Sequence, residues 1–373
     1  MLFKNPDMRY FIIPIFVPHL GCPHQCVFCN QRRITGASHS AVTQDLLEKT
    51  IKLYIRTWVK RERVKTQVAF YGGSFTGLDF NIQESLLSKT HDFIKSGMID
   101  SIRISTRPDY IDSDTVCFLK AHGVETIELG VQSMVDRVLT LSGRGHTSSD
   151  VQKAVGIIKR HKLEIGLQIM PGLPGDTQEL IMDTVNMVIE MRPDFVRIYP
   201  TLVIKDTPLE EFYLRGKFLP MTLDGAVNIC KKVILVLNNA DIPVVRLGLQ
   251  PTEELERDGT IVAGPYHPSF RQLVESSIFI DMATILLERV SLCDKKLTFR
   301  VNSKDYSYFC GQKNSNIAKL KERYKLKDIG VISEIGLKRG TLELIAGTSI
   351  FCIKRKELIR KALNPKQDQT LNS

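Results

Sequence analysis

Three cysteines lie close together near the start of the 373-residue chain: Cys22, Cys26 and Cys29 are separated by three and then two residues. Thiolates at this spacing suit an iron-sulfur cluster or zinc. A structural zinc site normally closes with four ligands, usually in two separated pairs, and the chain has no second close pair of cysteines. Three thiolates on four irons leave one iron open to a substrate or cofactor. We therefore predict an enzymatic [4Fe-4S] cluster, with His19 and His24 as rival ligands in the same loop.

Alternating strands and helices are expected to position that loop. A buried strand over 10–17 leads directly into it, and five further strands are expected at 67–71, 101–105, 125–130, 164–170 and 195–199. Helical spacing of apolar residues separates each strand from the next. Six such units in series predict an α/β fold, a partial (β/α)6 barrel with its chemistry at the carboxyl ends of the strands.

The pattern changes after residue 200. We expect an irregular segment at 201–220, helices at 222–240 and 270–290, and a strand at 242–249. Strands at 296–301 and 331–345 then flank a helix at 314–324. The predicted domains are a core barrel at 1–215, a barrel-associated extension at 216–290, a small basic α+β domain at 291–363 and a disordered tail at 364–373.

Composition and cysteine content indicate the compartment. The first apolar run, 10–17, is too short to span a bilayer and lacks the features of a secretory signal. Eight cysteines in a chain of this length are too few for a disulfide scaffold. We expect a cytoplasmic protein without a membrane partner, and the sequence leaves its oligomeric state open.

The formal charge of +10 is concentrated near the C-terminus. Residues 291–373 contain 18 Lys and Arg against 8 Asp and Glu, whereas the first 290 residues contain 33 of each. A basic terminal segment on a neutral body favours a polyanionic partner such as nucleic acid. A solvated basic surface explains the charge equally well.

Further motifs follow the later strands in a recognisable order. The cysteine loop ends the first strand, and Tyr71-Gly-Gly-Ser-Phe75 ends the second. This arrangement resembles the radical S-adenosylmethionine superfamily. The resemblance implies that the open iron chelates S-adenosylmethionine and that an injected electron cleaves it to methionine and a 5′-deoxyadenosyl radical. It also implies a flavodoxin- or ferredoxin-type electron donor.

The same resemblance assigns cofactor contacts to residues at the strand ends. Gly72 and Gly73 receive the methionine amino group through their backbone, and Arg144 pairs with the methionine carboxylate. In some relatives an acidic residue stands where this chain has Ser105 or Gln168, so the ribose contacts are expected to differ. The predicted cofactor-binding residues are Gly72, Gly73, Ser105, Gln132, Arg144, Gln168 and Met170.

A finer resemblance, over residues 10–215, is to the catalytic subunit of Elongator and its shorter bacterial relatives. Segments 71–76, 128–133 and 144–147 carry it, and especially 197–204. That subunit modifies the C5 position of wobble uridine in tRNA with acetyl-CoA held by a second domain. It also has a longer first cysteine gap, and this chain has no acetyl-CoA pyrophosphate loop and too few residues after 270 for an acetyltransferase.

The resemblance implies the radical half-reaction on tRNA or another RNA. One alternative is a radical enzyme acting on a small molecule of the coproporphyrinogen type, and another is a non-catalytic iron-sulfur or zinc module that binds RNA. Segment 311–314 and the helix after it resemble the loop and helix of KH modules, although Asn314 replaces the second glycine. A β-α-β packing module with a solvated basic face is the other interpretation. The predicted RNA-contacting residues are Lys313, Lys319, Lys321 and Arg323.

Overall fold

The computed structural model describes residues 9–17, 22, 26–35, 42–57, 64–290 and 297–358. Contacts between residues divide the chain into two compact units. The first unit comprises Met1–Met221 and Leu249–Pro265, and the second comprises Thr222–Gly248 and Tyr266–Ser373. No helix in the described ranges is long and apolar enough to cross a membrane.

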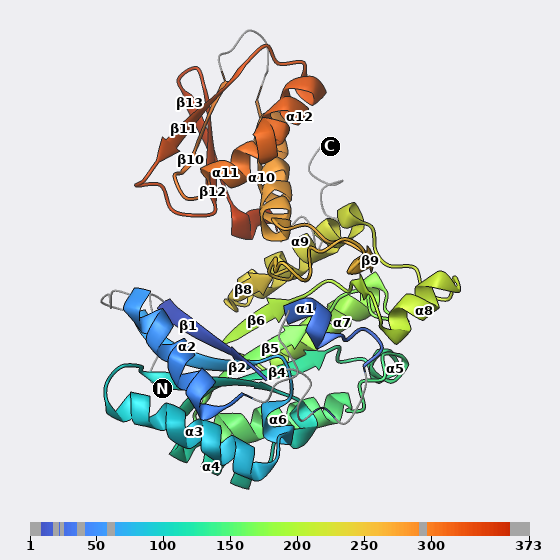
Figure 1. The fold of residues 1–373 in the computed structure, drawn as a ribbon. Helices are drawn as coiled ribbons and strands as arrows, with labels where there is room; N and C mark the ends of the chain where they lie inside the picture. Colours follow the sequence, from blue (N-terminus) through green and yellow to red (C-terminus); the bar gives the residue numbers. More distant parts are fainter. Residues whose placement is uncertain are drawn as a thin grey trace. The chain divides into compact units, whose positions relative to one another are not determined.

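The first unit contains a curled sheet of six parallel strands that neighbour one another in chain order (Figure 1). The strands are β1 (Arg9–Phe16), β2 (Val64–Tyr71), β3 (Ser101–Thr106), β4 (Val124–Gln132), β5 (Glu164–Ile169) and β6 (Phe195–Ile198). The connecting helices are α1 (Gln31–Thr35), α2 (Gln44–Thr57), α3 (Phe80–Lys95), α4 (Ser113–Ala121), α5 (Asp136–Leu141), α6 (Ser148–Arg160) and α7 (Gln178–Glu190), with short 3-10 turns η1 (Phe75–Gly77) and η2 (Pro108–Tyr110). The predicted partial barrel of six βα units is confirmed.

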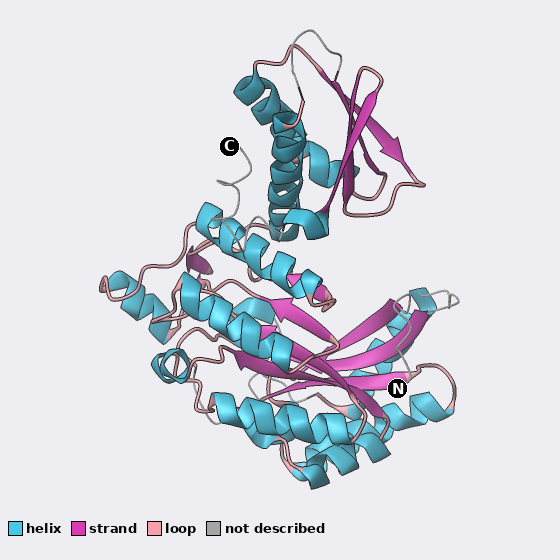
Figure 2. Ribbon diagram, turned by 180° about the vertical axis from the view of Figure 1, so that it is seen from behind, coloured by secondary structure: helices cyan, strands magenta, loops and turns pink. Residues whose placement is uncertain are grey.

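The two faces of this sheet have different chemistry. Helices α2, α3, α4 and α6 pack against one face (Figure 2), and the strands bury apolar residues such as Phe70, Ile104 and Leu167 there. Because strand side chains alternate between faces, the intervening residues point inward, and many of these are polar and buried. Side-chain caps begin several helices on the outer layer, Asp79 at α3 and Thr147 at α6 among them.

Segment 201–220 is more regular than predicted. It contains the short strand β7 (Val203–Ile204) and the helix α8 (Pro208–Leu214). The Thr207 side chain caps α8 and Pro208 occupies its first turn, which is a helix-start signal that the prediction missed. β7 pairs antiparallel with β9 (Ile261–Ala263), and a two-residue strand is too short to show a periodicity.

The second unit combines helices with a four-stranded mixed sheet. Its elements are α9 (Leu223–Asn239), β8 (Val244–Leu247), α10 (Phe270–Glu288), β10 (Leu297–Asn302), α11 (Tyr306–Cys310), η3 (Gln312–Asn314), α12 (Ser315–Tyr324), β11 (Ile329–Glu334), β12 (Thr341–Ala346) and β13 (Ser349–Lys354). The strand order is β11-β10-β12-β13. The single strand predicted at 331–345 is wrong, because a turn ending at Gly340, where φ is +70°, separates β11 from β12.

The units also differ from the predicted domain limits. Helix α10 packs against α9, β12 and α12, so most of the predicted extension at 216–290 groups with the basic segment, and 249–265 groups with the barrel. The predicted disordered tail at 364–373 lies outside the described residues.

Candidate active site

The described part of the cysteine loop is anchored by the segments that follow β4 and β6. Cys26 and Phe28 are buried in an apolar cluster that includes Val138, Leu173 and Leu209. The Val27 N–H donates to the carbonyl of Ser142 at 3.1 Å, and the Val27 carbonyl accepts from the N–H of Leu209 at 2.8 Å. Residues distant in sequence therefore hold this loop at the carboxyl ends of the strands.

The surroundings of the Cys26 and Cys29 thiols determine which charge they carry. Burial and the neighbouring Cys26 thiol raise the pKa of Cys29 to about 12, so a thiolate at Cys29 is stabilised by a positive ion that balances its charge. Arg144 Nη1 lies 3.4 Å from Cys26 Sγ. The chemistry of these two thiols therefore fits the cluster that the sequence predicts.

The ligand set of the cluster stays a prediction. Cys22 is exposed, and the residues on both sides of it lie outside the described ranges, as do the rival ligands His19 and His24. Among described residues, no group of three His, Cys, Asp or Glu side chains is arranged to hold a metal ion.

The glycine pair after β2 lies beside the cysteine loop. Gly72 has a φ of +91°, which side chains rarely tolerate, and a Cβ there would lie 3.4 Å from Cδ1 of Phe16. The backbone N–H of Ser74, directly after the glycine pair, donates to the Cys22 thiol. The Ser74 Oγ lies 2.9 Å from Thr106 Oγ1. The ends of β2 and β3 are thereby tied together next to Cys22.

Four predicted cofactor residues meet at the ends of β4 and β5. Gln132 has a left-handed φ of +68° at an irregularity in the register, and its Oε1 accepts from Gln168 Nε2 at 3.3 Å. The Met170 N–H donates to the Gln132 carbonyl at 2.8 Å. Arg144 Nη2 donates to the Gly130 carbonyl at 2.6 Å, and only a glycine allows this approach, because a Cβ at 130 would lie 2.6 Å from the same nitrogen.

The buried guanidinium of Arg144 retains binding capacity. Its Nε has no hydrogen-bond partner among the described residues, although the side chain is buried. A buried donor without a partner is costly, and a bound anion such as a carboxylate would satisfy it. Ser105, the remaining predicted residue, lies on β3 opposite Glu128 in the register, and its predicted ribose contact stays a prediction.

A small cavity beside Gln132 and Met170 is lined in part by Asp176, a residue that the sequence analysis missed. Gln132 and Met170 line it together with Ser133, Ile169, Pro171, Asp176, Ile181 and Thr184. Burial raises the pKa of Asp176 to about 6, and its carboxylate accepts the N–H of Gly172 at 3.0 Å. Its position directly after the Met170–Gly175 loop was the available signal.

His146 is a second missed residue, two positions beyond Arg144. It is buried, and its ring Nε2–H donates to the Val131 carbonyl at 3.2 Å. Burial and then the charge of Arg144 lower the pKa of His146 to about 4, so the ring is neutral at pH 7. A charged imidazole would repel the cationic group that faces the cysteines.

The His146 shift predicts a pH dependence of stability. Between about pH 6.5 and 4 the unfolded chain binds more protons than the folded one, so the contribution of His146 to the unfolding free energy falls as pH falls, by about 1.4 kcal/mol per unit. Urea unfolding of the wild type and of His146→Gln at several pH values measures this contribution. Subtracting the two unfolding free energies removes the opposite effect of Asp176, which both proteins share. A difference that does not change with pH contradicts the prediction, and His161→Gln, at the end of α6, is the control.

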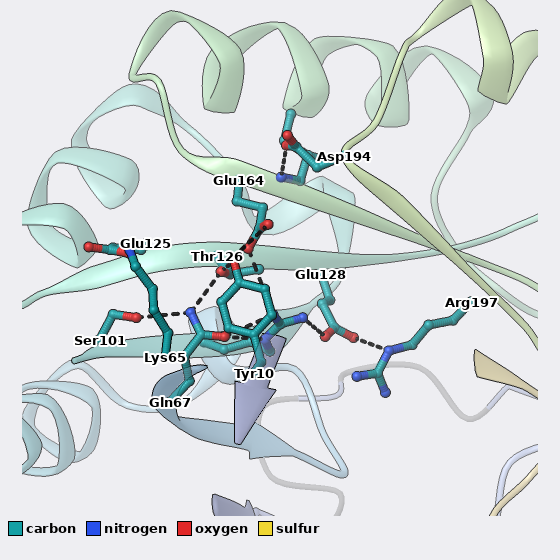
Figure 3. A network of polar contacts seen from close by, with 12 residues as sticks. Tyr10, Lys65, Gln67, Ser101, Glu125, Thr126, Glu128, Glu164, Asp194 and Arg197 are labelled. Atoms are coloured by element: carbon teal, nitrogen blue, oxygen red, sulfur yellow. Dashed lines mark hydrogen bonds and ion pairs between the residues drawn. The ribbon is translucent and has the colours of Figure 1, made fainter. Parts of the chain in front are cut away.

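The inward face of the sheet carries a buried charged network that sequence reasoning also missed (Figure 3). Arg103 Nη1 donates to Glu128 Oε1 at 2.7 Å, and Arg197 Nε lies 2.9 Å from Glu128 Oε2. Glu164 accepts from Tyr10 at 3.1 Å and lies 3.7 Å from Arg103. Two arginines therefore balance two glutamates inside the first unit.

The predicted RNA-contacting residues lie in the second unit, on α12 and the turn before it. Lys313 and Asn314 both have left-handed φ values, of +50° and +60°. Lys319 and Arg323 are exposed one turn apart, and Lys321 pairs with Asp328 at 3.2 Å. The turn and helix are formed as predicted, while RNA contact stays a prediction.

Comparisons with known proteins match most of the first 279 residues to two family models. The family model of the radical SAM superfamily matches residues 16–188, and the model of the radical SAM C-terminal domain matches 193–279. An uncharacterised protein of Methanocaldococcus jannaschii is 30% identical over 231 residues, which cover 59% of this chain and 69% of that protein.

Two further matches are to a named relative and to a solved structure. A protein named tRNA uridine(34) acetyltransferase, also from Methanocaldococcus jannaschii, is 27% identical over 257 residues, which cover 58% of this chain and 47% of that protein. The solved archaeal Elp3 of Methanocaldococcus infernus is similar in fold, with a TM-score of 0.57 at 21% identity, over 73% of this chain and 63% of that one. The chain spans about half the length of the acetyltransferases it matches.

Proposed function

The chain belongs to the radical S-adenosylmethionine superfamily, whose enzymes bind a [4Fe-4S] cluster and S-adenosylmethionine, and we propose that this member acts on tRNA or another RNA in the cytoplasm. When bound, these cofactors supply a 5′-deoxyadenosyl radical that abstracts a hydrogen atom. The observation that carries the cofactor part of the proposal is the convergence of Arg144, Gln132, Gln168 and Met170 beside Cys26.

In this proposal the chain's own residues orient S-adenosylmethionine. The unpartnered donor of Arg144 binds the methionine carboxylate, while the backbone at Gly72 and Gly73 receives the amino group. Gln132 and Gln168, already bonded to each other, present amides to the ribose, and the Met170 backbone lies on the adenine side. Phe28 and the apolar cluster around it exclude water from the thiols.

The enzymatic part is tested with anaerobically reconstituted protein. With dithionite in place of the expected flavodoxin- or ferredoxin-type donor, the protein should convert S-adenosylmethionine to 5′-deoxyadenosine. Mass spectrometry of tRNA nucleosides from cells with and without the gene then tests the substrate. An unchanged set of modified nucleosides contradicts an RNA substrate.

The names of the relatives and the basic second unit support an RNA substrate. Three relatives are named tRNA uridine(34) acetyltransferase. Lys313, Lys319 and Arg323 present exposed positive charge on one helix and its leading turn. Because the residues that bind a phosphate backbone release its counterions, such binding weakens steeply with salt.

A charge reversal tests this surface. Changing Lys319, Lys321 and Arg323 together to glutamate should weaken tRNA binding and flatten its salt dependence, by roughly 0.7–0.9 in the log-log slope for each lost phosphate contact. Filter binding from low to high salt measures the effect. The matched control reverses Lys153, Lys159 and Arg160, which are exposed on α6. Absent or salt-insensitive binding by the wild type would favour a small-molecule substrate of the coproporphyrinogen type.

A further inference from the structure

Three half-buried side chains on the inward face of the sheet lie next to the predicted cofactor residues. Tyr71 ends β2, one residue before Gly72. Arg197 on β6 is paired in register with Gln168 on β5, and Tyr199 follows that strand directly. Arg197 therefore links the buried charged network to the residues that would hold S-adenosylmethionine, and Tyr71 and Tyr199 lie on either side of it.

The Arg197 guanidinium is held in one orientation. Its Nη2 donates to the Tyr71 hydroxyl at 2.8 Å and its Nη1 to the Tyr199 hydroxyl at 3.3 Å, while Nε faces Glu128 at 2.9 Å. The guanidinium carbon also lies 5.1 Å from the centre of the Tyr71 ring. Contacts on all three nitrogens fix the plane of the group, which reduces the entropy lost when a ligand binds.

Around Arg197, some hydrogen-bond donors have no partner among the described residues, whereas the acceptors are occupied. A guanidinium has five N–H groups. The hydroxyls of Tyr71 and Tyr199 use one on each terminal nitrogen of Arg197, so each terminal nitrogen keeps another. Its Nε lies 2.9 Å from Glu128 Oε2 but makes no hydrogen bond to a described residue. The Tyr199 hydroxyl accepts from Arg197, and its own hydrogen has no acceptor among the described residues. Both oxygens of Glu128 are already engaged, by Arg103, Tyr71 and Arg197.

We propose that Arg197 and Tyr199, oriented by Tyr71 and Glu128, form a donor site that binds a carbonyl or carboxylate oxygen of the substrate beside the cofactor. Surplus donors without a free acceptor select an oxygen ligand and disfavour an amine or ammonium group. The assignment rests on the proposed function, under which this oxygen belongs to an RNA base; since the relatives are named for tRNA uridine, we take it to be a pyrimidine carbonyl. A carboxylate of a small acid offers the same chemistry, and the experiment below distinguishes the two sources.

Equilibrium dialysis tests the site without turnover. Reconstituted protein with S-adenosylmethionine, but without a reductant, is dialysed against labelled uridine and, separately, against labelled acetate. Tyr199→Phe removes one hydroxyl and Arg197→Lys keeps the charge but removes the planar fork, so each should weaken binding by about threefold to tenfold. Tyr10→Phe is the matched control, because it removes a hydroxyl from the same network at Glu164, away from Tyr199.

Each outcome decides the assignment. Uridine binding that weakens in both variants, but not in the control, supports a pyrimidine carbonyl, and the same pattern with acetate supports an acid. Binding of neither probe, or equal affinities in Tyr199→Phe and Tyr10→Phe, overturns the site. If Arg197→Lys does not fold, Tyr199→Phe alone decides. A wild type that binds a probe yet modifies no RNA refutes the proposed substrate and leaves the donor site standing.

Discussion

Replacing Cys26 with alanine will abolish both the brown iron-sulfur chromophore and the formation of 5′-deoxyadenosine. The thiol is buried beside the Arg144 guanidinium, and with it gone only two of the three predicted ligands remain. Open-iron chemistry requires all three, so no partial activity is expected. Iron and sulfide analysis after anaerobic reconstitution, with chromatography of the nucleoside product, measures the two losses together. The same result is expected for Cys22→Ala and Cys29→Ala.

The matched control is Cys117→Ala. Cys117 is an exposed cysteine on α4, 3.8 Å from Nδ1 of His161 and far in sequence from the loop. The Cys117→Ala variant should bind iron and cleave S-adenosylmethionine as the wild type does. Full iron content in Cys26→Ala would show that the ligands have been assigned wrongly. Loss of iron in the Cys117 variant as well would point to a general defect in reconstitution.

Arg103→Leu will cause the largest loss of stability that we expect from one substitution. The side chain is only 5% exposed, and it contacts Glu128 at 2.7 Å and the Gln67 side chain at 2.8 Å. Leucine fills part of the space but leaves two carboxylates with one guanidinium inside the unit. Removing one partner of a buried ion pair costs about 3–5 kcal/mol, which urea unfolding monitored by circular dichroism will measure.

An exposed ion pair on the same sheet provides the comparison. Lys65 on β2 contacts Glu125 on β4 at 3.1 Å (Figure 3). The two side chains are 38% and 50% exposed to solvent. Solvent screens this pair, so Lys65→Met should change the unfolding free energy by about 1 kcal/mol or less. Equal losses in the two variants would mean that the interior network contributes no more than a surface contact.

The fold and part of the site could be predicted from sequence because their signals are local. Apolar runs bounded by glycine and polar residues marked the six strands of the first unit, and each motif followed its strand closely enough to be placed at a carboxyl end. Gln132, Gln168 and Met170 were expected to meet, and Gln132 is hydrogen-bonded to both of the others. The two-residue strand β7 and the turn after β11 were missed, since neither is long enough to show a period.

The charged network and the missed site residues could not be predicted in this way. Arg103, in Ser101-Ile-Arg-Ile-Ser105, alternates with apolar residues as in a strand with one face in water. Curling of the sheet encloses that face instead, so Arg103, Glu128 and Glu164 are buried and must pair with residues from other strands. The burial that shifts the pKa values of His146 and Asp176 is likewise a property of the assembled unit.

The sequence alone therefore determined the type of chemistry, through the spacing of Cys22, Cys26 and Cys29 and the order of the motifs after successive strands. The tertiary structure decided which side chains share the interior with that chemistry: the orientation of Arg197 between Tyr71 and Tyr199 depends on strands more than 120 residues apart. The physical reason is that spacing along a chain fixes which groups can share one loop. Only the packed sheet fixes which charges lose contact with water and must find partners.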